Sequence, residues 1–232
     1  MVRNRLCLNV LSKKLMRDAG EIRQHFLELL NHALPRLSMY GDEQTALHFL
    51  NHLAFIDERE DDLESLLDGL TKRGAAISAT RVSGAFQQVT GHQATEKEIA
   101  SVYAEVAFQM GYLDVGRLLS GSEFANLKSG LRDYCRDHDL TTSEVKERFG
   151  DPSWFTGTNP VWPCVYLYIS EEPEFGSVAF DFWNEIDYDE QTTAVNGRFG
   201  DIPALRNVRI HGNDFKSEFT FTPIGREITK RS

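Results

Sequence analysis

Apolar residues recur every three or four positions through the first two thirds of the chain, which is the spacing of helices that bury one face. The first of these runs ends at Pro35, because proline cannot continue a helix. Two later runs each begin with a capping box, formed by Thr95 with Glu98 and by Thr141 with Glu144. The pattern predicts about six helices before residue 150, one of them spanning 122–136.

The pattern changes to strict alternation after Gly150, which is typical of strands. Asn196-Gly197 is the residue pair that two-residue hairpin turns prefer, so we expect a turn there. The alternating segments predict an antiparallel sheet of four or five strands. In chain order, strands are expected over 165–169, 178–183, 205–210 and 215–222, with a turn at 172–176 between the first two.

The fold class expected is therefore α+β, with a helical N-terminal region followed by a small antiparallel β-sheet region. Three parts are expected along the chain: a basic tail at 1–17 that could be disordered, a helical region at 18–150, and a sheet region at 151–232. Whether the residues before Met16 belong to the native start is left open.

Composition narrows the class of protein. Of the 232 residues, 41% are apolar and 26% are charged, which is typical of a globular protein. The net charge of −10 argues against nucleic acid and anionic membranes as direct partners, because both favour clusters of Lys and Arg. Cys7, Cys135 and Cys164 are odd in number and widely spaced, so we expect reduced thiols. Without an 18-residue apolar run, we expect a cytoplasmic protein.

Charge and aromatic residues concentrate in one stretch. Residues 149–197 contain no Lys or Arg, nine carboxylates and eleven of the 25 aromatic residues. Acids mixed with large rings favour binding of a basic protein, because rings anchor the contact while carboxylates steer it. The residues expected to bind this partner are Tyr166, Tyr168, Glu171, Glu172, Glu174, Asp181, Trp183, Glu185, Asp187, Tyr188, Asp189 and Glu190.

Four of these residues have two possible roles. Tyr166, Tyr168, Asp181 and Trp183 are expected on the strand face opposite Phe180. If no other layer covers that face, its exposed rings form part of the partner-binding surface. If the helical region packs there, the same rings join the two parts of the protein.

Metal and catalytic motifs are weak by comparison. His48 and His52 share one helical face at a separation that a single zinc ion can bridge. No glutamate follows His48 to complete an H-E-x-x-H motif, so these two histidines are at most weak metal candidates. The chain lacks a nucleophile elbow, a P-loop and a dinucleotide-binding glycine motif. We therefore predict no catalytic residue and no cofactor, and the motifs match no known family.

These observations favour a non-enzymatic inhibitor that binds a basic protein. The expected biological form is a cytoplasmic immunity protein or antitoxin that neutralises a toxic effector such as a nuclease, since carboxylates can occupy the position of a phosphate backbone. Two alternatives remain: a metal-dependent hydrolase that uses His48 and His52, and a structural or regulatory adaptor.

Overall fold

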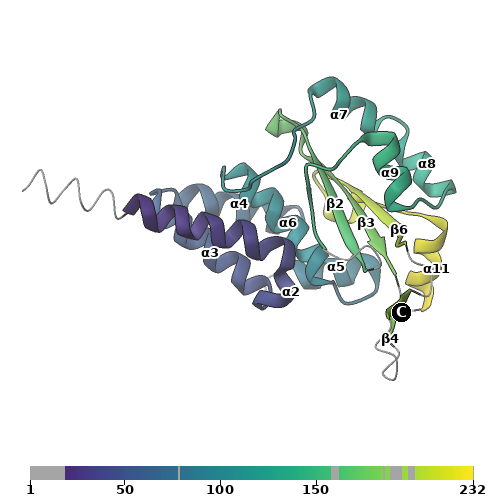
Figure 1. The fold of residues 1–232 in the computed structure, drawn as a ribbon, viewed down its shortest axis with the longest axis horizontal. Coiled ribbons are helices and arrows are strands. Elements are labelled where there is room, and N and C mark those ends of the chain that lie inside the picture. The colour runs from purple at the N-terminus through teal and green to yellow at the C-terminus, as the bar shows by residue number, and fades with distance from the viewer. Residues whose placement is uncertain are drawn as a thin grey trace, which may run out of the picture.

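The computed structural model describes residues 19–77, 79–157, 162–184, 186–188, 195–197 and 202–231, which we call the described residues. They form an α+β fold, as predicted, in which a five-stranded antiparallel sheet lies between two groups of helices (Figure 1). No helix in this part of the chain has the length and apolar character needed to cross a membrane.

Helices make up most of the chain before residue 150. Residues 19–33 are helical, and a 3-10 helix at Leu34–Arg36 follows, with Pro35 in its first turn. The helices after it are α2 (Leu37–Tyr40), α3 (Glu43–Ile56), α4 (Glu60–Lys72), α5 (Arg81–Thr90), α6 (Glu96–Gln109), α7 (Gly121–Lys128), α8 (Leu131–Asp137) and α9 (Thr142–Phe149).

The main sheet has the strand order β1-β2-β3-β6-β7, and all four neighbouring pairs are antiparallel. A 3-10 helix at Pro173–Phe175 connects β2 to β3, where the sequence predicted a turn. The elements of this part are β1 (Trp154–Phe155), β2 (Cys164–Ile169), β3 (Ser177–Trp183), β4 (Ile186–Tyr188), β5 (Val195–Gly197), β6 (Ala204–Ile210), α10 (Phe215–Glu218), β7 (Phe219–Phe221) and α11 (Pro223–Arg231).

Both faces of the sheet are buried, each in its own apolar core. Val165, Leu167 and Ala179 pack with the helices of the first 110 residues. Tyr168 and Phe180 pack on the opposite face, with residues of α7, α8 and α9. Figure 1 shows α6 and α7–α9 on opposite sides of β2 and β3. This explains why β2 and β3 are apolar on both sides.

Helix α6 is the central helix of the first core. Residues 98–107 are all buried, because α3, α4, α5 and the sheet surround the helix. The capping boxes predicted at Thr95/Glu98 and Thr141/Glu144 are both present, and Ser120 with Glu123 forms a further one at the start of α7.

Three predicted elements were wrong in detail. The helix expected over 122–136 is two helices, because the chain turns at Ser129 and Gly130, and Gly130 has a φ of +68° that favours glycine. The strand expected over 215–222 begins as α10 and only then becomes β7. Asn196 and Gly197 lie within β5, paired with Asp187 and Ile186, and do not form the predicted turn.

Candidate functional site

The antiparallel register of β2 and β3 divides the predicted aromatic face between two layers. Tyr166 lies opposite Phe180, whereas Asp181 lies opposite Val165. Tyr166 therefore shares the face covered by α7–α9, and Asp181 shares the face covered by α6. The prediction of one common face was wrong, because alternation within each strand does not show how two strands are aligned.

These residues are packed inside the protein. The side chains of Tyr166, Tyr168 and Asp181 are 9%, 0% and 7% exposed. Trp183 is half-buried, and its ring centre lies 5.0 Å from the guanidinium carbon of Arg206. The sequence left two roles open for these residues. The structure shows that they join the helical region to the sheet and do not form an exposed aromatic face.

The predicted binding residues that the structure describes outside β2 and β3 lie before and after β3. Glu171 is exposed and Glu172 is half-buried in the connection before β3, while Asp187 and Tyr188 lie in β4, after it. The seven-residue strand β3 separates these positions by roughly 20 Å. The side chains of Glu174, Glu185, Asp187, Tyr188, Asp189 and Glu190 lie outside the described residues.

Strands β4 and β5 form a separate two-stranded sheet. Ile186 pairs with Gly197, Asp187 with Asn196, and Tyr188 with Val195. In Figure 1, β4 lies beyond the end of the five-stranded sheet and near the end of α11. We call residues 185–197 the acidic hairpin, since Glu185, Asp187, Asp189 and Glu190 fall within six residues of its sequence.

The end of β3 that precedes the acidic hairpin in the sequence contacts a buried group of polar residues that we call the Arg206 cluster. It consists of Arg206, Glu98, Asp181, His92 and Asn207. Arg206 Nε donates to Asp181 Oδ2 at 2.8 Å, Nη2 donates to Glu98 Oε1 at 2.5 Å, and Nη1 donates to the His92 ring at 2.7 Å. Arg206 is fully buried, so each of these contacts replaces lost hydration.

The two carboxylates of the Arg206 cluster differ in acidity. Burial and the neighbouring Glu98 raise the pKa of Asp181 above its usual value, despite the opposing charge of Arg206. Burial also acts to raise the pKa of Glu98, but Arg206, His92 and the Thr95 backbone outweigh it and lower that pKa. Catalytic acid and base pairs can show such a difference. Both carboxylates are buried, however, so we interpret the cluster as a structural contact between α6 and the sheet.

A second buried group, the Glu105 cluster, lies further along α6. It contains Glu105, Arg73, Arg209, Glu218 and His211. Glu105 accepts from Arg73 Nη2 at 3.1 Å and lies 2.8 Å from Arg209 Nη1, while Arg73 donates to Glu218 at 2.6 Å. The cluster thereby connects α6 to the end of α4, to β6 and to α10.

Sequence reasoning missed these buried charges. Their signal lies in α6, where Glu98 and Glu105 interrupt a segment that is apolar on nearly every side. A helix that is apolar all round is buried, and a buried carboxylate requires a partner. Glu98 was explained by its capping box alone, although its second oxygen binds Arg206.

His48 and His52 remain weak metal candidates. Their ring centres are 4.1 Å apart, and one His52 ring nitrogen contacts the His48 carbonyl oxygen at 2.7 Å. Among the described residues, no group of three His, Cys, Asp or Glu side chains could hold a metal ion. Asp57, the first carboxylate after His52 in the sequence, binds Arg23 with both carboxylate oxygens.

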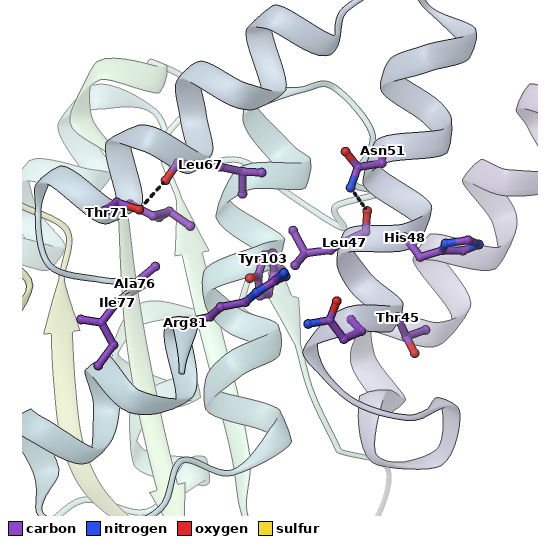
Figure 2. Close-up of a pocket in the computed structure, with 12 residues that line it drawn as sticks. Thr45, Leu47, His48, Asn51, Leu67, Thr71, Ala76, Ile77, Arg81 and Tyr103 are labelled. Carbon is purple, nitrogen blue, oxygen red and sulfur yellow. Dashed lines mark hydrogen bonds between the residues drawn. The ribbon is translucent and has the colours of Figure 1, made fainter. Parts of the chain in front are cut away.

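His48 also lines the edge of a cavity of about 680 Å³ bordered by α3, α4, α5 and α6 (Figure 2). Arg81 contributes to this cavity from an unusual backbone conformation with a φ of +47°. For a residue other than glycine, this conformation costs on the order of 1 to 2 kcal/mol. Such strain in a cavity wall is a reason to consider a binding role.

Comparison with known proteins assigns no family to the chain. No protein-family model matches it, and neither a curated protein nor a solved structure shows significant similarity to it.

Proposed function

We propose that this protein is a non-enzymatic inhibitor that binds a basic protein effector through the acidic hairpin. In this proposal the protein is a cytoplasmic immunity protein or antitoxin, and the effector that it neutralises is a toxic protein such as a nuclease. The observation that carries the proposal is the separation of β4 and β5 from the five-stranded sheet, combined with the hairpin's sequence.

The position of the hairpin suits a binding element. In the sequence it follows β3 and Asn184, and the Arg206 cluster holds the end of that strand through Asp181 and the Trp183 ring. A strand end that is already held reduces the ordering cost of association, because β3 does not have to be immobilised when a partner binds the acidic hairpin.

The charge of the hairpin suits a basic partner. Glu185, Asp187, Asp189 and Glu190 flank Tyr188 in the sequence, and no Lys or Arg occurs between 149 and 197. A group of negatively charged carboxylates accelerates association with a cationic surface, and a tyrosine side chain buried at the interface slows dissociation.

Affinity capture from native lysate, at low and at high salt, tests the proposal. We expect wild type to retain a basic protein in stoichiometric amount and to release it as salt rises, because salt screens charge pairs at an exposed surface. The captured protein should be assayed for nuclease or other toxic activity with and without the inhibitor.

A hairpin variant and a matched control give the comparison. Combining Glu185→Gln, Asp187→Asn, Asp189→Asn and Glu190→Gln should weaken binding by at least about tenfold and reduce its salt dependence. The control removes the same charge from exposed positions of α4 through Glu60→Gln, Asp61→Asn, Glu64→Gln and Asp68→Asn. Equal loss in both variants, or undiminished binding by the hairpin variant, would contradict the proposal.

A further inference from the structure

We infer that the cavity bordered by α3, α4, α5 and α6 binds a small carboxylate that carries an apolar group. This site is distinct from the acidic hairpin, and the inference does not depend on the proposed function. A volume of about 680 Å³ falls within the range of roughly 300 to 1,000 Å³ that is usual for small-molecule sites.

The walls of the cavity are suited to an apolar group. Leu47 of α3 and Leu67 of α4 approach the cavity from different sides, with Ala76 and Ile77 at another edge (Figure 2). The polar side chains of Asn51 and Thr71 already donate to carbonyl oxygens of their own helices, at 2.7 Å and 3.3 Å. One Asn51 N–H and the Thr71 hydroxyl hydrogen are therefore engaged within the protein.

The charge of the lining favours an anion. The chain carries 35 acidic residues, yet none lines this cavity, and Arg81 is its one Lys or Arg among the described residues. Glu43 is buried, accepts a hydrogen bond from the Tyr103 hydroxyl and does not line the cavity. Arg81 is exposed at the cavity, and its guanidinium is well suited to a carboxylate, because the two planar groups can form two parallel hydrogen bonds.

The backbone holds Arg81 at the cavity. Ile77 and Arg81 exchange two backbone hydrogen bonds, Arg81 N–H to Ile77 O at 2.7 Å and Ile77 N–H to Arg81 O at 3.1 Å. This closes a tight loop before α5 and fixes Arg81 at a φ of +47°. Figure 2 shows the guanidinium pointing toward Tyr103, across the cavity from Thr71.

Tyr103 forms a fixed polar end to the cavity. Its hydroxyl donates to Glu43 Oε1 at 2.6 Å. Glu43 Oε1 also accepts from the Val82 N–H at 3.0 Å. Burial and the Glu43 carboxylate raise the pKa of Tyr103 above its usual range, so the phenol stays protonated. The Tyr103 oxygen thus adds no negative charge beside Arg81.

Two probes of equal apolar size test the inference: 4-phenylbutyrate and the uncharged 4-phenylbutanol. Binding is followed by amide chemical shifts on the full chain. We expect saturable binding of the acid with shifts centred on Leu67, Thr71 and Arg81, and an affinity for the alcohol at least about tenfold weaker. Equal affinities, shifts centred elsewhere, or no saturation at millimolar concentrations would overturn the inference.

Two variants separate charge from shape. Arg81→Gly removes the guanidinium and accepts the positive φ, so the fold is retained while affinity for the acid falls at least about tenfold. Thr71→Trp fills the cavity from the exposed end of α4 and should abolish binding of both probes. The matched control is Glu58→Gly, which changes another residue with positive φ, at 55°, outside the cavity. Undiminished acid binding by Arg81→Gly would refute the role of the guanidinium.

Discussion

Arg206 shows how a single residue fastens the two parts of the protein together. Its side chain is fully buried and contacts Glu98 of α6, Asp181 of β3 and His92 after α5. The segment 92–98 and strand β3, which lie far apart in the sequence, therefore share one guanidinium. Removing one member of a buried ion pair leaves the remaining charges without compensation, which costs more than the pair itself contributes.

We expect Arg206→Met to reduce the free energy of unfolding by on the order of 3 to 5 kcal/mol, because Glu98 and Asp181 lose their shared partner. Arg136→Met is the matched control, since Arg136 is 58% exposed and pairs with an exposed Asp133. That substitution should cost less than about 1 kcal/mol. Urea denaturation of both variants at neutral pH measures the two losses of unfolding free energy. Similar losses would show that the buried ion pairs of Arg206 stabilise the protein no more than the exposed pair does.

At the scale of elements, α6 contacts the sheet through polar residues as well as apolar ones. Glu98, Ser101 and Glu105 lie three and four residues apart, so they follow one side of the helix. Each binds a cationic residue of β6: Glu98 binds Arg206, and both Ser101 and Glu105 contact Arg209. These three polar residues fix the position of α6 along β6 more specifically than apolar contacts would, because each needs a particular partner.

Because of the Glu105 cluster, we expect the stability of the fold to depend on pH. Burial acts to raise the pKa of Glu105, but Arg209, His211 and Arg73 outweigh it and bring the pKa well below its usual range. The unfolded chain therefore binds the Glu105 proton at a higher pH than the folded chain does. The stabilisation is complete above the unfolded pKa of about 4.3 and is lost as pH falls toward the lower folded value.

We expect Glu105→Gln to be less stable than wild type at pH 7 and to lose less stability on acidification. Below about pH 4.3 this one group adds up to about 1.4 kcal/mol per pH unit to the wild-type slope, and the amide removes it. Urea denaturation of both proteins from pH 7 to pH 3 measures the two slopes. Parallel curves would show that Glu105 does not titrate in this way.

The sequence predicted those elements whose signals are local. The capping boxes at Thr95 and Thr141 and the connection between β2 and β3 depend on neighbouring residues, and all three are present. The buried contacts were not predicted, because Glu98 and Arg206 are 108 residues apart and each resembles a surface residue when considered alone. The cavity was missed for a similar reason, since it combines side chains from position 44 to position 103.

At the scale of the whole molecule, the first core crosses the boundary predicted near Gly150. It includes Leu30 of the first described helix, Val102 of α6, Leu167 of β2 and Phe215 of α10. The Arg206 and Glu105 clusters cross the same boundary. If residues 18–150 were separated from the sheet, Glu98 and Glu105 would lose the partners that compensate for their burial.

The helical region and the sheet should therefore unfold together in one transition. The chain offers a direct test, because its three tryptophans, Trp154, Trp162 and Trp183, all lie in the sheet region. Far-UV circular dichroism reports mainly on the helices before residue 150. We expect the urea midpoints from tryptophan fluorescence and circular dichroism to coincide, as they do for a two-state transition. Separate midpoints would instead mean that the two regions are independent domains and that the buried clusters couple them only weakly.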